Sequence, residues 1–219
     1  KYSLNMKVFE NKKINSQKLT PFNSKDYTNV MKTDALKTAL DDGKYDFVYG
    51  GSRRDEEPSR SKEKIFSFRD KEHRWNPIGQ RIEPWQIFNH KHNPGESFRI
   101  FPMSNWTELD IWQYIKAEEI EIVNLYFSKK RKSVIRDKEI YLLDDDRFEL
   151  KRTDKIKELD IRFRTLGCYP LTLGIESDAT DIDMIINEIV NTKYSERYGR
   201  IIDKDTQSSM EIKKKKGYF

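Results

Sequence analysis

The chain has 219 residues, of which 36% are hydrophobic and 36% charged, and its formal net charge is +5. This length suffices for one sizeable core, and the modest positive charge suits anionic partners without requiring nucleic acid. The single cysteine, Cys168, excludes an intrachain disulfide, and without a membrane-spanning run or a signal-peptide pattern we expect a cytoplasmic protein with no membrane partner.

The first half of the chain predicts a helix and a strand in succession, as in α/β sheets. Residues 1–25 are polar and begin at Lys1 rather than methionine, so we expect the sequence to be cut from a longer one. Residues 26–40 place apolar side chains at helical spacing between Asp26, a predicted N-cap, and Gly43, a predicted stop. Residues 45–49 predict a buried strand. Residues 59–74 predict a partly helical segment or ordered loop, 75–96 mostly loop, and 98–101 a short strand.

The second half predicts two helices and a hairpin. Asn105 and Glu108 form a capping-box arrangement at the start of the first helix. Residues 139–150 predict a hairpin that turns at the three aspartates 144–146, and we prefer this turn to a cation site. Residues 180–191 predict the second helix. Residues 195–219 form a polar tail, in which we expect the four lysines at 213–216 to stay solvated. We divide the chain into residues 1–115 and a C-terminal region, 116–219.

The loop that follows the first predicted strand carries the strongest chemical signal. Two glycines let the backbone turn sharply and approach a ligand closely. Arginines supply forked donors for phosphate or sulfate oxygens, and carboxylates between them can orient the arginines or hold a divalent cation. The alternative is a surface salt-bridge cluster. The candidate residues of this loop are Gly50, Gly51, Arg53, Arg54, Asp55, Glu56 and Arg60.

A second candidate segment covers residues 162–172. Arg162 and Arg164 lie two residues apart in an extended stretch, so both would project to the same side as a paired anion clamp. Thr165 is a further candidate, and Gly167 permits a turn that presents backbone N–H groups to an oxyanion. The alternative is an edge strand with solvated arginines. We expect Cys168 to be a packed side chain rather than a nucleophile.

Other residue types give weaker signals. His73, His90 and His92 do not form a metal-ligand set, so no zinc site is predicted. Trp75 and Trp85 lie in the loop region and are open to a ligand-stacking role. No P-loop motif and no Gly-x-Gly-x-x-Gly motif occurs in the sequence.

Taken together, these stretches resemble the small catalytic subunits of heterodimeric bacterial ATP sulfurylases (sulfate adenylyltransferase subunit 2). The likeness runs through residues 31–33, 50–60, 62–70, 73–75, 104–115 and 162–170 and through parts of the tail after residue 195. It implies an α/β fold of the adenine-nucleotide α-hydrolase-like (Rossmann-like) type. In that fold helices cover both faces of a parallel sheet, and here an extended C-terminal region and a tail would follow.

The resemblance also implies a reaction, a partner and a cofactor. Sulfate and ATP would give adenylyl sulfate and pyrophosphate in sulfate assimilation, driven by a larger GTPase subunit, and we expect Mg²⁺ to accompany the ATP. Arg53, Arg54 and Arg60, with Arg162 and Arg164, would then form the clamp for sulfate and phosphate. Asp55 and Glu56 would orient these arginines or contact the ligands of Mg²⁺ rather than the ion itself. Gly50 and Gly51 would bring backbone amides to the nucleotide.

Two comparisons within the wider family refine this expectation. Reductase relatives use a cysteine nucleophile near the C-terminus, whereas no cysteine follows Cys168 here. The family's Ser-Gly-Gly-x-Asp-Ser loop, which grips pyrophosphate, does not occur in this sequence, and we expect it upstream of Lys1 in the physical protein. Two alternatives stay open: a non-catalytic fragment that only docks the partner, and a basic nucleic-acid-binding module.

Overall fold

The computed structural model describes residues 4–11, 19–20, 22, 26–56, 60–83, 88–144, 148–166, 172–196 and 214–215. The chain forms two compact units that alternate along the sequence. Unit 1 comprises Lys1–Gly50, Lys64–Ile100 and Glu211–Phe219, and unit 2 comprises Gly51–Glu63 and Phe101–Met210. The boundaries of these units differ from the predicted domain boundary after residue 115. The predicted division into two domains is not tested by these units and stays a prediction.

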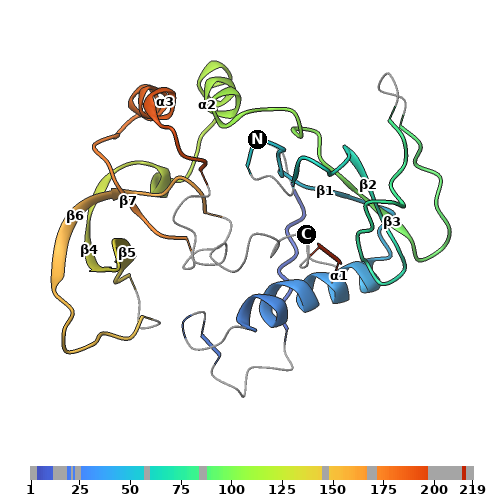
Figure 1. Ribbon diagram of the computed structural model, residues 1–219, viewed down its shortest axis with the longest axis horizontal. Coiled ribbons are helices and arrows are strands. Elements are labelled where there is room, and N and C mark those ends of the chain that lie inside the picture. Colours follow the sequence, from blue (N-terminus) through green and yellow to red (C-terminus); the bar gives the residue numbers. More distant parts are fainter. Residues whose placement is uncertain are drawn as a thin grey trace. The chain divides into compact units, whose positions relative to one another are not determined.

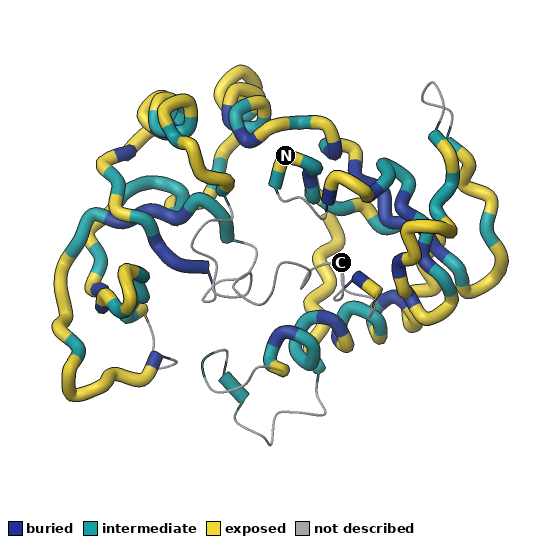
Figure 2. Tube along the Cα trace, viewed as in Figure 1, coloured by how far each residue is buried: buried dark blue, intermediate teal, exposed yellow. Residues whose placement is uncertain are grey.

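Unit 1 contains a three-stranded sheet in the order β1-β3-β2 (Figure 1). Its strands are β1 (Phe47–Tyr49), β2 (Phe66–Arg69) and β3 (Ser97–Ile100). β1 runs parallel to β3, whereas β2 runs antiparallel to it. β3 is buried along its whole length, and it appears dark blue in Figure 2. The α/β class is therefore confirmed, and the predicted parallel pairing joins β1 to β3.

The predicted helix at residues 26–40 is confirmed and runs slightly further. It begins as a π-helix, η2 (Asn29–Asp34), and continues as α1 (Ala35–Gly43). A Cβ atom on Gly43 would lie 2.0 Å from the Tyr45 ring, so a larger residue at the helix end would require this exposed ring to move. Lys44 then turns the chain with a left-handed φ of 49°.

Two predictions for the strands of unit 1 are wrong. The strand at 45–49 is not buried, because β1 lies at the edge of the described sheet and leaves Phe47 and Tyr49 exposed. Residues 59–74 contain the strand β2, which was not predicted. Its buried positions include Ser67 and Arg69, which are polar, so the sequence lacks the apolar residues expected on a buried face. Burial of polar side chains on one face of β2 removes the alternation that normally identifies a strand.

Trp75 and Lys214 also differ from their predictions. Trp75 is 1% exposed, so it is not open to a stacking ligand, while Trp85 lies outside the described residues. The Lys214 ammonium lies 4.7 Å from the centroid of the Trp75 ring, and this lysine is buried rather than solvated. A cation that stacks on an indole inside unit 1 serves packing and is not presented to nucleic acid.

Unit 2 contains a four-stranded sheet in the order β5-β4-β6-β7, with every neighbouring pair antiparallel. The strands are β4 (Lys129–Arg136), β5 (Glu139–Leu142), β6 (Ile156–Arg162) and β7 (Ile175–Glu176). The predicted hairpin at 139–150 is wrong, because β5 pairs with the preceding β4 across Asp137 and Lys138. These two residues have φ values of 50° and 68°, as a two-residue hairpin turn requires. β4 was missed because it opens with four cationic residues, and of the aspartates 144–146 only Asp144 is described.

The helices of unit 2 are α2 (Glu108–Ala117), α3 (Ile182–Asn191) and the short 3₁₀-helix η5 (Asn124–Tyr126). Both predicted helices are confirmed, and Trp112, Ala179 and Ile185 form the core beside them. The N-cap of α2 is Thr107, not Asn105, because the Asp110 side chain completes the capping box with Thr107. In the described part of the chain, no helix has the length and apolar character that crossing a membrane requires.

Candidate functional site

A cavity of about 520 Å³ in unit 2 brings together several of the predicted site residues. The charged part of its lining comes from the loop 51–56, the start of α2, the segment after β6 and the segment after α3. These charged residues are Arg53, Glu56, Glu108, Arg164 and Glu196. The apolar part of the lining is Met103, Ile111, Trp112, Ile115, Ile122, Tyr126 and Leu166. The cavity therefore has a charged side and an apolar side.

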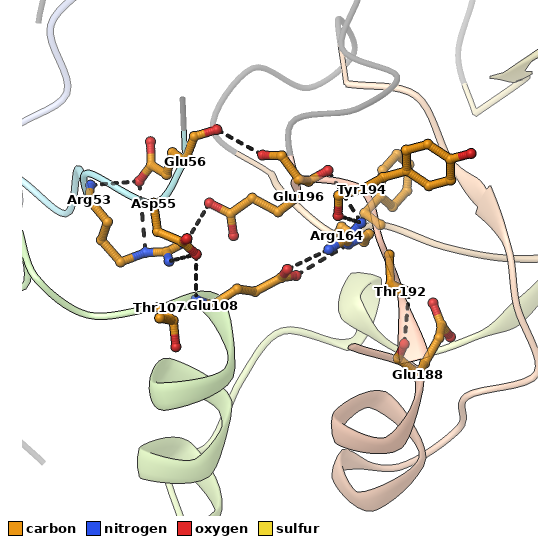
Figure 3. Close-up of polar contacts among 12 residues, drawn as sticks. Arg53, Asp55, Glu56, Thr107, Glu108, Arg164, Glu188, Thr192, Tyr194 and Glu196 are labelled. Carbon is orange, nitrogen blue, oxygen red and sulfur yellow. Dashed lines mark hydrogen bonds and ion pairs between the residues drawn. The ribbon is translucent and has the colours of Figure 1, made fainter. Parts of the chain in front are cut away.

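Arg53 is held on the charged side of this cavity. Its guanidinium is 6% exposed and donates a hydrogen bond from Nη2 to the Glu196 carboxylate (Figure 3). Nη1 lies 3.5 Å from the Trp106 carbonyl oxygen and 3.8 Å from the Asp55 carboxylate. The Arg53 backbone N–H donates to Glu56 at 2.9 Å. The contacts of Nη1 and Nη2 fix the guanidinium in one orientation, and Glu196 is its closest anionic partner among the described residues.

Arg164 links three segments of unit 2. Nε and Nη2 donate to the two carboxylate oxygens of Glu108, with Nε at 3.2 Å. Nη1 donates to the carbonyl oxygens of Tyr194 at 3.1 Å and Ser195 at 3.3 Å. A planar guanidinium suits this bidentate pairing because its N–H groups point in fixed directions. Arg164 thereby ties the segment after α3 to the first turn of α2.

The first turn of α2 explains why the loop 51–56 lies where it does. The Asp55 carboxylate accepts a hydrogen bond from the Glu108 backbone N–H at 3.3 Å, and the Arg54 N–H donates to the Ser104 carbonyl at 2.8 Å. The first N–H groups of a helix have no partner within the helix, so an acidic side chain stabilises this end. The capping box of Thr107 and Asp110 fixes the turn that presents Glu108 to the cavity.

The cavity has an acidic group that titrates near neutral pH. Burial raises the pKa of Glu196 to about 7, against the opposing effect of Arg53, and the carboxylates of Glu108 and Glu56 raise it further. Burial and the nearby Glu196 also raise the pKa of Tyr126. Desolvation disfavours the charged form of an acid, and neighbouring negative charges do the same. The charge on this side of the cavity therefore changes between mildly acidic and mildly basic pH.

The other arginines of the predicted loop clamp do not line the cavity. Arg54 donates from Nε and Nη2 to the Glu63 carbonyl at 3.2 and 3.1 Å, and from Nη1 to Asn105 at 2.5 Å. Arg60 is buried and pairs with the Glu63 carboxylate at 3.2 Å. Both arginines brace the loop against its neighbours. Of the three predicted loop arginines, the structure brings Arg53 into the cavity.

The predicted pair of Arg162 and Arg164 is also separated. Arg162 is 1% exposed and donates to Glu188 at 2.7 and 3.2 Å and to Ser177 at 3.2 Å. β6, which ends at Arg162, pairs with β4 and β7, so it is not an edge strand with solvated arginines. Although burial acts in the opposite direction, hydrogen bonds from Arg162 and Ser177 hold the pKa of Glu188 below its usual value. These contacts indicate that Arg162 stabilises the fold of unit 2 and does not bind a ligand in the cavity.

The remaining candidate residues fall in three places. Gly51 and Thr165 line the cavity, and the Thr165 hydroxyl is buried there without a hydrogen-bond partner among the described residues. Gly50 belongs to unit 1, where its N–H donates to the Ile100 carbonyl at 2.9 Å. Gly167 lies outside the described residues. A buried hydroxyl without a partner is a ready donor or acceptor for a ligand.

Sequence reasoning assigned no site role to Glu108 or Glu196. The sequence suggested Glu108 as a capping residue, and the resemblance quoted the tail around Glu196 without giving it a function. Only Glu108 had a local feature that could have indicated a site role: it is a charged residue among apolar residues at the start of an amphipathic helix. Glu196 follows a polar stretch and becomes a site residue only through its contact with Arg53.

The described residues do not fit a metal held by the protein alone. Within the described ranges, no group of three or more His, Cys, Asp or Glu side chains lies close enough to hold a metal ion. Asp55 and Glu56, the predicted candidates, are engaged with Arg53 and with the first turn of α2. Mg²⁺ usually needs one or two carboxylates in addition to substrate phosphates.

Comparison with known proteins gives a consistent result. Residues 1–174 match the family model described as "Phosphoadenosine phosphosulfate reductase domain". The "Sulfate adenylyltransferase subunit 2" of Akkermansia muciniphila is 54% identical over 218 residues, 99% of this chain and 72% of the relative. Proteins of the same name from Citrifermentans bemidjiense and Psychromonas ingrahamii are 56% and 52% identical over 88% and 100% of this chain. The chain spans 64% and 73% of these two relatives.

Proposed function

Because the chain belongs to the sulfate adenylyltransferase subunit 2 family, we propose that it transfers the adenylyl group of ATP to sulfate. The products are adenylyl sulfate and pyrophosphate. The structural observation that supports this proposal is the placement of Arg53 and Arg164, from distant parts of the sequence, on the charged side of one cavity. Reduction of a sulfonucleotide is not proposed, since the relatives that are 52–56% identical to this chain are named sulfate adenylyltransferase subunit 2.

The reaction requires positioning and charge neutralisation more than acid–base chemistry. A sulfate oxygen attacks the α-phosphorus of ATP, the bond from that phosphorus to the bridging oxygen breaks, and pyrophosphate leaves with the electron pair. Sulfate is fully deprotonated at neutral pH, so no general base is needed. ATP and sulfate repel each other, and preorganised cationic donors offset this repulsion in the transition state. Arg53 fits this role because hydrogen bonds to Trp106 and Glu196 fix its guanidinium in orientation within the cavity.

The proposal extends to the partner, the metal ion and the compartment. The name "subunit 2" of the relatives implies a partner, subunit 1. We propose that this partner is a larger GTPase and that its GTP hydrolysis offsets the unfavourable formation of the phosphate–sulfate anhydride. Mg²⁺ would arrive bound to ATP, since the described carboxylates of the loop are engaged with arginine and helix N–H groups. We place the reaction in the cytoplasm.

The test is sulfate-dependent pyrophosphate release from ATP by the chain together with its partner subunit and GTP. We expect release from the wild type, and a loss of about 10²–10³-fold in kcat for Arg53→Ala, the usual effect of removing one transition-state donor. Arg152→Ala is the matched control, because Arg152 is an exposed arginine of the same unit outside the cavity. A folded complex that releases no pyrophosphate in response to sulfate would reject the reaction. Near-normal turnover of Arg53→Ala would remove Arg53 from the site.

A further inference from the structure

We propose that the Glu196 carboxylate occupies the anion subsite of Arg53 and that a tetrahedral oxyanion substrate such as sulfate must displace it to bind. The inference rests on the proposed function, since it takes Arg53 as a contact of the substrate anion. It assigns Glu196 the role of an internal competitor that controls access to this subsite.

The contacts of Arg53 leave little room for a substrate while Glu196 is in place. The guanidinium is 6% exposed, and the Glu196 side chain that accepts from its Nη2 is 13% exposed. Figure 3 shows the Glu196 carboxylate directed at Arg53 beside Glu56 and Asp55. A carboxylate and a sulfate present similar oxygen acceptors to a guanidinium. An incoming anion therefore reaches this nitrogen by replacing the Glu196 oxygen.

Hydrogen bonds to the backbone around Glu196 hold its side chain next to Arg53. Arg164 donates to the carbonyl oxygens of Tyr194 and Ser195, the two residues before Glu196, at 3.1 and 3.3 Å. The Ser195 hydroxyl donates to the Glu56 carbonyl oxygen at 2.7 Å. These bonds hold the backbone of the segment 194–196 against both the loop 51–56 and Arg164 in the segment after β6. The side chain of Glu196 can then leave Arg53 without loss of the backbone contacts.

The charges around Glu196 make it a weak competitor. Arg53 and Glu56 face it from the loop, Glu108 from α2, and Arg164 from the segment after β6. Tyr126 lies on the same cavity. Two carboxylates and burial oppose ionisation of Glu196, whereas the two arginines favour it. An ion that is costly to keep charged is readily exchanged for a stronger anion.

This competition predicts a pH dependence of sulfate binding. With the pKa of Glu196 at about 7, the side chain is mostly neutral at pH 6 and mostly ionised at pH 8. If sulfate binds the form in which Glu196 is neutral, the apparent Kd rises as that form becomes rarer. The rise is about tenfold between pH 6 and pH 8. Sulfate itself keeps its charge over this range, so the change reports on the protein.

The experiment measures binding of inorganic sulfate to the complex of the chain and its partner subunit by calorimetry at pH 6, 7 and 8. We expect the wild type to bind about tenfold more weakly at pH 8 than at pH 6. Glu196→Gln keeps the size of the side chain but removes its charge, so its Kd should stay near the wild-type pH 6 value at all three pH values. Glu176→Gln is the matched control, because Glu176 is an exposed carboxylate on β7 outside the cavity, and it should follow the wild type.

The titration of Glu196 itself provides a readout that does not depend on a variant. Saturating sulfate should raise the pKa of the Glu196 carboxyl in the wild type, followed by NMR, because sulfate binds the form in which Glu196 is neutral. Equal sulfate affinity at pH 6 and pH 8 in the wild type, or weaker binding to Glu196→Gln, would overturn the inference.

The two proposals fail in different ways. Sulfate-dependent pyrophosphate release with no effect of Glu196 on sulfate binding would leave the reaction intact and remove the competitor role. Sulfate binding that follows the charge of Glu196, without any sulfate-dependent pyrophosphate release, would leave the anion subsite intact and reject the reaction.

Discussion

The ion pair of Arg162 and Glu188 allows a direct test of whether Arg162 supports the structure or binds substrate. Glu188→Gln removes the negative charge and leaves the Arg162 guanidinium, which is 1% exposed, without its counterion. Removing one partner of a buried ion pair costs about 3–5 kcal/mol. Glu188 is 30% exposed, so water compensates part of this loss, and we expect a value at the lower end, about 3 kcal/mol.

The assay is urea unfolding of the chain, followed by circular dichroism. For an m-value of about 1–3 kcal/mol per molar urea, a loss of about 3 kcal/mol lowers the midpoint by about 1–3 M. The double variant Arg162→Met/Glu188→Leu should recover much of the loss, because apolar residues of similar size remove the uncompensated charge. A buried pair that only stabilises the fold should leave the sulfate KM of the folded enzyme unchanged. A normal midpoint together with a raised sulfate KM in Glu188→Gln would refute this reasoning and return Arg162 to the substrate clamp.

Three further predictions concern α2, the core and the acidic group of the cavity. Thr107→Ala should reduce the free energy of unfolding by about 1 kcal/mol through loss of the N-cap, measured by denaturation; an N-cap at Asn105 would instead leave this variant unaffected. Ile185→Ala should cost about 2–5 kcal/mol because Ile185 is buried in the core, whereas Val190→Ala on the exposed face of α3 should change stability by less than about 0.5 kcal/mol. The pKa of Glu196 is higher in the fold than its ordinary value, so the folded state retains a proton that the unfolded chain loses. Stability should therefore fall by up to about 1.4 kcal/mol per pH unit as pH rises from about 5 to 7, and Glu196→Gln should abolish this slope in thermal unfolding.

Local patterns in the sequence were sufficient for several elements of the fold. The helices η2–α1, α2 and α3 were predictable because apolar side chains at helical spacing and residues such as Gly43 act over a few positions. The strand β3 was predictable because Phe98, Ile100 and Phe101 form a short run with apolar residues on both sides of Arg99. The family was also evident from sequence, since the motifs extend over nearly the whole chain.

Strand pairing was less accessible to the same reasoning. β4 opens with four cationic residues and was missed, so its partner β5 was assigned to the wrong hairpin. β2 was missed because Ser67 and Arg69 on one of its faces are buried. In both cases the neighbouring strand, rather than the local composition, decides that the segment is extended.

Local sequence patterns were therefore enough to predict the α/β class, the helices, and an arginine-rich loop with a second arginine-rich segment. Which of those arginines share a cavity follows from the fold: Arg53 and Arg164 do, whereas Arg162 pairs with Glu188 outside it. With 42 basic and 37 acidic residues in the chain, very many ion pairs are compatible with the sequence. Which ion pairs form depends on contacts between distant segments, such as that of Glu196 with Arg53. These contacts cannot be predicted from the local sequence around either residue.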